Sequence, residues 1–224
     1  MEYKEIREQI CDVCHKMWQL GWVAANDGNV SVKLEDGNFL VTPTGISKSF
    51  ITPEKLVIID KDMNVVSAEG NYKPSSEIKM HMRCYTERED VGAVVHAHPP
   101  TATGYAVAGK SLDEYSMIET VIAIGSIPLT PYGTPSTNEV PEAIAPYLKE
   151  HDVLLLQNHG ALTVGCDHCK WWLMRTAGID EMIITGDADW FHIIGITPAL
   201  SDKLEQICLE TVKTAKKARS YRKS

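Results

Sequence analysis

Short apolar runs alternate with segments of helical periodicity along the chain, and this alternation restricts the fold more than any other feature. Strand-like runs lie at 30–34, 39–42, 56–59, 91–98, 127–129 and 153–157. Helices are expected at 6–20, 75–85, 101–108 and 139–149, and the last third of the chain is expected to be mainly helical. Such a mixture predicts a layered α/β domain.

The turn between the first two strand-like runs indicates how the sheet is built. It contains Asp36-Gly37, a dipeptide typical of a hairpin. An early hairpin favours a mixed sheet over an all-parallel one. The chain has 224 residues with no internal repeat or linker, so a single domain over residues 1–224 is expected.

Composition excludes several classes of protein. The formal charge of −8 disfavours a broad nucleic-acid surface, and the basic run 213–223 is interpreted as a solvated helix end. No run reaches the roughly 18 apolar residues of a membrane span, and the charged N-terminus lacks a signal-peptide core. A cytoplasmic protein with no membrane or nucleic-acid partner is expected, its six cysteines being reduced thiols.

His96-Ala97-His98 lies at the end of the run 91–98, directly before Pro99. Residues i and i+2 of a strand point to the same face, so the two imidazoles would lie side by side, as ligands of one metal ion do. Taken alone, the pair is equally compatible with two unrelated surface histidines. His159, between an apolar strand and Gly160, is the best third ligand, and the other five histidines are interpreted as non-ligands.

Glu77 is the best acid/base candidate. It follows Ser75-Ser76 at an expected helix start, where a carboxylate could equally cap its own helix. Beside a metal ion, the same carboxylate could accept a substrate proton.

Three small polar segments are suited to an anion such as phosphate. They contain Gly28 and Asn29, Thr44 and Gly45, and Ser75 and Ser76. The two serines would lie at a helix N-terminus, where free N–H groups favour negative charge. Each segment taken singly is more often a plain turn or cap.

Together these segments resemble the class II aldolase/epimerase family, most of all its fuculose-1-phosphate aldolase branch. The resemblance covers roughly residues 5–165. The matching segments, in family order, are Gly28-Asn29-Val30-Ser31, Thr42-Pro43-Thr44-Gly45-Ile46, Pro74-Ser75-Ser76-Glu77, Val94-Val95-His96-Ala97-His98, Ser126-Ile127-Pro128 with Pro131-Tyr132, and Leu155-Leu156-Gln157-Asn158-His159-Gly160.

The resemblance implies a fold, a reaction and a set of site residues. The fold is a three-layer α/β/α sandwich on a mixed, mostly antiparallel sheet, commonly assembled as a cyclic homotetramer. The reaction is zinc-dependent, reversible cleavage of a ketose 1-phosphate to dihydroxyacetone phosphate and an aldehyde. The residues implied are His96, His98 and His159 as zinc ligands, Glu77 as acid/base and resting ligand, and Asn29, Thr44, Gly45, Ser75 and Ser76 as phosphate-binding residues.

The sequence departs from the family pattern in two places. The tyrosine that precedes the Ser-Ile-Pro segment has no clear match; its position falls near Met117 with Tyr115 close by, and Tyr221 is a weak substitute. Residues 166–195 differ from the usual helix, since Gly178 and Gly186 would each cost a helix about 1 kcal/mol relative to Ala.

Three other functions on the same fold stay open. A pentulose-phosphate 4-epimerase tends to carry aspartate at the position of Glu77, so Glu77 favours an aldolase. A methylthioribulose-1-phosphate dehydratase shares the metal site and the glutamate. A metal-free, adducin-like scaffold would not need the intact histidines. The sugar itself stays open among fuculose, ribulose and 5-deoxypentulose phosphates.

Overall fold

The central layer is an eight-stranded sheet, in a computed structural model that describes residues 2–113, 125–166, 172–175 and 182–185. The strands are β1 (Asn29–Lys33), β2 (Phe39–Val41), β3 (Val57–Ile59), β4 (Val65–Ser67), β5 (Val91–Ala97), β6 (Leu129–Thr130), β7 (Val153–Leu156) and β8 (Gly160–Cys166). Their order is β4-β3-β2-β1-β5-β8-β7-β6. Only β6 and β7 pair in parallel; the other pairs within this sheet are antiparallel.

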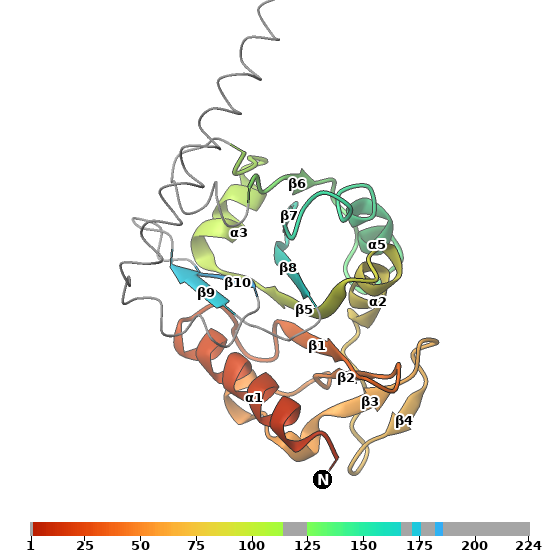
Figure 1. Cartoon of the computed structure of the whole chain (residues 1–224). Coiled ribbons are helices and arrows are strands. Elements are labelled where there is room, and N and C mark those ends of the chain that lie inside the picture. Colours follow the sequence, from red (N-terminus) through yellow and green to blue (C-terminus); the bar gives the residue numbers. More distant parts are fainter. Residues whose placement is uncertain (1, 114–124, 167–171, 176–181, 186–224) are drawn as a thin grey trace, which may run out of the picture.

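Helices cover both faces of the sheet (Figure 1). They are α1 (Lys4–Gln19), α2 (Ile78–Glu87), α3 (Pro100–Val107) and α5 (Glu139–Ile144), with short 3-10 turns η1 (Lys48–Phe50) and η2 (Pro53–Lys55). Side chains of α1 and α3 pack on one face of the sheet, and those of α2 and α5 pack on the other. The predicted three-layer α/β/α sandwich with a mixed, mostly antiparallel sheet is confirmed.

The central strand β5 shows why this layering forms. All seven of its residues are buried. Val95 packs in the cluster under α1, whereas Val94 packs in the cluster under α2. Successive side chains of a strand point to opposite faces, so a strand covered on both sides must be apolar on both.

Helix α1 follows the predicted periodicity. Ile10, Val13 and Met17 lie on its buried face, and the helix ends before Gly21, whose φ of +72° suits the left-handed conformation that glycine adopts readily. Cys11 and Cys14 are free thiols buried in the same cluster. Cys11 and Cys14 are therefore side chains of the hydrophobic core.

The expectation of a mainly helical last third is contradicted only in the described part of that third, because residues 186–224 lie outside the described residues. In that part, β8 is followed by an antiparallel pair, β9 (Trp172–Arg175) and β10 (Met182–Thr185). Aromatic and β-branched residues in these two runs favour strands. The helix expected over 139–149 ends at Ile144. The sequence pattern showed no sign of β4, a three-residue edge strand whose residues are all exposed.

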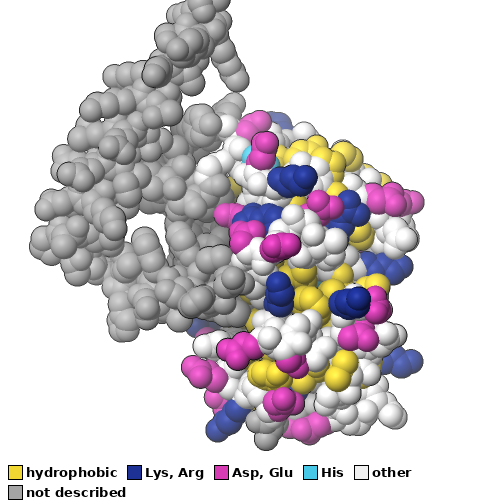
Figure 2. Space-filling view, turned by 45° about the vertical axis from the view of Figure 1, so that its right-hand side comes forward, with side chains coloured by type: hydrophobic (Ala, Val, Ile, Leu, Met, Phe, Trp, Pro, Cys, Tyr) yellow, Lys and Arg dark blue, Asp and Glu magenta, His cyan; other side chains and the backbone are white. Residues whose placement is uncertain are grey.

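The surface carries mixed charge on the face shown in Figure 2. Asp and Glu side chains stand among Lys and Arg side chains there. Within the part of the chain that the structure describes, no helix is long and apolar enough to cross a membrane. The basic run 213–223 lies outside the described residues.

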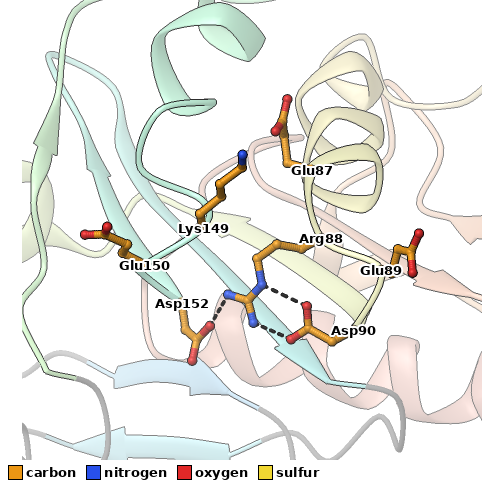
Figure 3. Close-up of a pocket in the computed structure, with 7 residues that line it drawn as sticks. All are labelled: Glu87, Arg88, Glu89, Asp90, Lys149, Glu150 and Asp152. Atoms are coloured by element: carbon orange, nitrogen blue, oxygen red, sulfur yellow. Dashed lines mark hydrogen bonds and ion pairs between the residues drawn. The ribbon is translucent and has the colours of Figure 1, made fainter.

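An ion-pair network centred on Arg88 joins the turn between α2 and β5 to the loop before β7 (Figure 3). Its guanidinium donates to both carboxylate oxygens of Asp90, at 3.0 and 2.5 Å. It also donates to Asp152 and, at 3.4 Å, to the Leu148 carbonyl. The hydrogen bonds from Arg88 lower the pKa of the Asp90 carboxyl. The Arg88 side chain is only 18% exposed, so its guanidinium is largely shielded from solvent.

Arg88→Lys should destabilise the fold, because a lysine keeps the charge but cannot donate in a fork to several acceptors. The expected fall in the free energy of unfolding, measured in urea, is about 1 kcal/mol. Lys4→Ala removes the exposed Lys4–Glu8 pair and serves as the control, with an expected loss below about 0.5 kcal/mol. Equal losses in the two variants would contradict a structural role for the Arg88 network.

Candidate active site

The end of β5 and the turn between β7 and β8 bring three histidines together. His96 is the penultimate residue of β5, and His98 follows the strand. In β8, Leu162 and Ala161 are paired with His96 and Ala97, so the β7–β8 turn lies beside the end of β5. His159 is the last residue of that turn, which Asn158 makes possible by adopting a φ of +57°.

The histidines face one another at short distances. Nε2 of His96 lies 3.0 Å from Nε2 of His98, and the ligand atoms of all three residues lie within 4.8 Å of one another. His96 is fully buried, while the side chains of His159 and His98 are 11% and 28% exposed. Solvent therefore reaches His98 and His159 in part, but not His96.

Gly160 makes room for this cluster. A Cβ atom at Gly160 would lie 2.5 Å from the carbonyl oxygen of Ala97, 2.6 Å from Cδ2 of His98 and 3.3 Å from Cε1 of His96. Any side chain would push the imidazoles or the β5 backbone away. The small residue after His159 is thus a steric requirement of the histidine cluster.

Burial and hydrogen bonding fix the protonation of the histidines. Burial, with smaller contributions from the neighbouring histidines, lowers the pKa of His96 well below its ordinary value and also lowers that of His98. Both rings are neutral at neutral pH. Nδ1 of His96 lies 2.9 Å from the Ala161 carbonyl oxygen, which can only accept, so His96 carries its proton on Nδ1. Its Nε2 lone pair points at the cluster, as in a metal-binding histidine.

Glu77 completes the cluster from helix α2. Its carboxylate Oε2 lies 3.4 Å from Nε2 of His96 and 3.4 Å from Nε2 of His159. Glu77 is the N-cap residue of α2, but its side chain makes no capping hydrogen bond. Ser75 Oγ instead accepts from the Glu77 backbone N–H, at 3.3 Å. The carboxylate is therefore directed at the histidines and not at its own helix.

The charge balance of this cluster favours a cation. Burial raises the pKa of Glu77, but the hydrogen bond from His159 and the electrostatic interactions with His96 and His159 outweigh it and lower the pKa to about 2. Two neutral imidazoles and an ionised carboxylate then face one another in a partly buried space. Adding a divalent cation would compensate the buried negative charge.

The donor set fits zinc. Three imidazoles are the protein ligands of one common type of catalytic zinc site. Tetrahedral zinc with bonds of about 2.0–2.1 Å needs ligand atoms roughly 3.3–3.4 Å apart. The separations of 3.0 Å between His96 and His98 and of 3.4 Å from Glu77 to His96 and His159 are close to this value, within a cluster that spans 4.8 Å. His159 Nδ1 is buried without a hydrogen-bond partner. The orientation of the His159 ring therefore depends on the group that Nε2 binds.

The three polar segments predicted to bind an anion also converge. Pro43 and Pro74 form an antiparallel bridge, in which Thr44 N–H donates to the Lys73 carbonyl at 2.9 Å and Ser75 N–H donates to the Thr42 carbonyl at 3.1 Å. Thr44 and Gly45 are thereby held beside Ser75 and Ser76. Thr42 N–H donates to the Val30 carbonyl, which brings both segments next to the start of β1.

Asn29 links these segments to the histidines. It begins β1 and lies opposite His96 in the antiparallel pairing of β1 with β5. Directly opposite residues have Cβ atoms about 4.5–5.5 Å apart on the same face. Gly28 has a φ of +71°, and a Cβ there would lie 2.5 Å from Val23 Cγ1 and 3.0 Å from the His96 carbonyl oxygen. Glycine is therefore required where this segment passes β5.

Sequence reasoning missed two residues that support the site. Lys48 is 1% exposed, and its ammonium donates to the carbonyls of Asn26 at 3.4 Å and Ile46 at 3.3 Å. It ties the segment before Gly28 to the one after Gly45. His81, buried behind Asn29, was interpreted only as a non-ligand. The position of His81 between Met80 and Met82 is the only signal that the sequence carried for it, and Lys48, between Ser47 and Ser49, carried none.

The remaining candidates lie elsewhere. His15 and His151 bind backbone carbonyls of Ile51 and Ser126 and are not members of the three-histidine cluster. His168 and His192 lie outside the described residues. The same holds for Tyr115, Met117 and Tyr221, the positions considered for the missing tyrosine.

Comparison with known proteins assigns the family. Residues 8–173 match the family model described as "Class II Aldolase and Adducin N-terminal domain". This chain belongs to the class II aldolase family.

Two aldolases of Escherichia coli match this chain over nearly their whole length. It is 35% identical over 216 residues to the L-fuculose phosphate aldolase of Escherichia coli (strain K12), covering 96% of this chain and 97% of the relative. It is 30% identical to the 5-methylthioribulose-1-phosphate/5-deoxyribulose-1-phosphate aldolase of Escherichia coli O45:K1, covering 96% and 98%. A solved L-fuculose 1-phosphate aldolase has the same fold, with a TM-score of 0.70, 24% identity and coverage of 94% and 98%.

Gly160→Ala should weaken metal binding by at least about 10-fold, the loss typical when residues that orient metal ligands are disturbed. The physical reason is the displacement of His96 and His98 by the added methyl group. Zinc affinity is measured by competition with a chromophoric chelator. Gly104→Ala, on α3 where a Cβ meets nothing within 4 Å, is the matched control and should bind zinc normally. Unchanged affinity in Gly160→Ala would contradict the steric argument.

Proposed function

We propose that this protein is a zinc-dependent aldolase that reversibly cleaves a ketose 1-phosphate of the fuculose-1-phosphate type to dihydroxyacetone phosphate and an aldehyde. One observation carries the proposal: Glu77 and three histidines meet at the end of β5, next to polar segments suited to phosphate. Family membership and the names of the relatives support the same reaction.

His96, His98 and His159 would hold the zinc ion through their Nε2 atoms, with Glu77 as a further ligand at rest. When bound, the ion acts as a Lewis acid toward the carbonyl and adjacent hydroxyl oxygens of the substrate and stabilises the negative charge that develops there. The intact cluster favours an enzyme over a metal-free, adducin-like scaffold.

Asn29, Thr44, Gly45, Ser75 and Ser76 would bind the substrate phosphate. Their backbone N–H, amide and hydroxyl groups are donors, and the start of α2 adds the positive end of a helix. Because the same segment that carries Ser75 and Ser76 also carries Glu77, a phosphate held there would place the neighbouring carbons within reach of the Glu77 carboxylate.

Glu77 would move the carbon-bound proton. In the cleavage direction the C4 hydroxyl gives up its proton to solvent, the C3–C4 bond breaks to leave the aldehyde, and the bonding electrons pass toward the C2 carbonyl. Glu77, after taking up a proton from solvent, would deliver it to C3, which completes dihydroxyacetone phosphate. In the reverse direction the ionised carboxylate removes that proton, and its low pKa means that the base form is present at neutral pH.

The proposal extends to the organisation of the protein. Residues 1–224 would form one class II aldolase domain, assembled as a homotetramer in the manner common in the family. The aldehyde remains open between two kinds. A deoxy-sugar aldehyde follows from the 35% identical relative, and a methylthio or deoxy aldehyde follows from the 30% identical one.

A panel of ketose 1-phosphates tests the proposal. Zinc-loaded protein should release dihydroxyacetone phosphate and an aldehyde from at least one of fuculose, ribulose, 5-deoxyribulose and 5-methylthioribulose 1-phosphates, with products identified by mass spectrometry. Treatment with a chelator should abolish this cleavage, and zinc should restore it. Epimerisation of a pentulose 5-phosphate without cleavage, or loss of water from the methylthio substrate, would replace the proposed reaction with one of the alternatives on this fold.

A further inference from the structure

A chain of four buried polar side chains runs from the candidate phosphate pocket into the interior between β1 and α2. Nε2 of His81 lies 2.5 Å from Asn29 Oδ1, Nδ1 of His81 lies 2.7 Å from Ser31 Oγ, and Ser31 Oγ lies 2.8 Å from the Tyr85 hydroxyl. Each of the four residues is at most 7% exposed. Buried polar groups of this kind hold one another in fixed orientations.

The hydrogen-bonding groups determine which side chain donates and which accepts at each step of this series. The amide oxygen of Asn29 only accepts, so His81 donates from Nε2–H. The burial of His81 lowers its pKa to about 4, so the ring is neutral and its Nδ1 has no proton. Ser31 must then donate its hydroxyl proton to Nδ1, and the Ser31 oxygen is left to accept from the Tyr85 hydroxyl.

These four hydrogen-bonded side chains lie next to the candidate active site. Asn29 lies opposite His96 on β1. His81 follows Glu77 by four residues at the start of α2, so the two side chains lie on the same face of the helix, one turn apart. His81 therefore lies behind Asn29, between the strand and the helix that carry the candidate site.

We propose that His81 is a positioning residue that fixes the side-chain amide of Asn29 with its oxygen turned inward and its NH2 group turned toward the substrate phosphate. This inference rests on the proposed function, in which Asn29 binds phosphate. His81 does not touch the substrate and acts only through Asn29.

The reason for the arrangement is electrostatic. An amide presents either a donor or an acceptor to its surroundings, and the two ends are almost the same size. With the opposite His81 tautomer, the amide would turn over and present its oxygen to the phosphate, and two acceptors would repel each other. The Ser31 hydroxyl, which can donate to a bare Nδ1, satisfies the tautomer that prevents this.

The imidazole nitrogens provide a direct test that does not depend on activity. In zinc-loaded protein labelled with 15N-histidine, long-range 1H–15N spectra should show His81 neutral, with the proton on Nε2 and a bare Nδ1. His81→Phe identifies the resonance by its loss. A proton on Nδ1 would overturn the proposal.

A double-mutant cycle tests the action through Asn29. His81→Phe should weaken binding of inorganic phosphate, measured by calorimetry, and raise KM for the ketose 1-phosphate. The expected change is about 10- to 100-fold, as for loss of one hydrogen bond to a charged group. The same change in an Asn29→Ala background should have little further effect, because the group through which His81 acts is already absent. Equal losses in both backgrounds would overturn the proposal.

Two further variants separate positioning from folding. His81→Gln retains an N–H donor near Asn29 Oδ1 and should recover most of the phosphate affinity, whereas a purely structural need for the imidazole would leave Gln as weak as Phe. His15→Gln, a change of a histidine on α1 in the other helix layer, is the control and should bind phosphate normally. Failure of the wild-type protein to bind any phosphate would overturn the proposed function as well. If the wild-type protein binds phosphate but the losses from His81→Phe and Asn29→Ala simply add, only the proposed role of His81 is overturned.

Discussion

The pairing of β5 with β1 on one side and β8 on the other holds the candidate site together. Its register places Asn29 and Leu162 on either side of His96, and Ala161, one residue before Leu162, gives its carbonyl to the His96 ring. A slip of one residue would turn every side chain to the other face of the sheet. The buried valines of β5 prevent such a slip, because both helix layers pack against them. The apolar core thus determines where the polar site can form.

The site combines groups that a protein interior otherwise disfavours. The site and its support contain an ionised Glu77, neutral histidines and a buried Lys48 ammonium. Burying each of these groups costs free energy unless a partner compensates. Backbone carbonyls compensate Lys48 and His96. The ionised Glu77 carboxylate faces the neutral rings of His96 and His98, which makes a cation a natural partner of this cluster. Glycine is required at positions 28 and 160 for a separate, steric reason, because a Cβ at either position would lie 2.5 Å from a neighbouring atom.

Much of this arrangement could be predicted from the sequence. The strand carrying His96 and His98, the turn carrying His159 and the helix start carrying Glu77 each have a local signal, and family order tied them together. Features that depend on contacts between distant segments could not be predicted. The strand β4 is too short to show a pattern, and the contacts of Lys48 and His81 arise only when separate loops and layers meet. The strands β8, β9 and β10 differ from the helical expectation for the described residues up to Thr185, because β-branched and aromatic residues there find partners in sheets.

Exchange of a carbon-bound proton of dihydroxyacetone phosphate with deuterated water tests the central claim most directly, because it needs only the metal cluster, the phosphate pocket and Glu77, and no aldehyde. Zinc-loaded wild-type protein should catalyse the exchange. Glu77→Gln should fold and retain zinc, yet exchange about 10²–10⁴-fold more slowly, the usual contribution of a general base. Glu87→Gln, at the other end of α2, should exchange at the wild-type rate. If Glu77→Gln also exchanges at that rate, Glu77 is not the base and the mechanism is wrong.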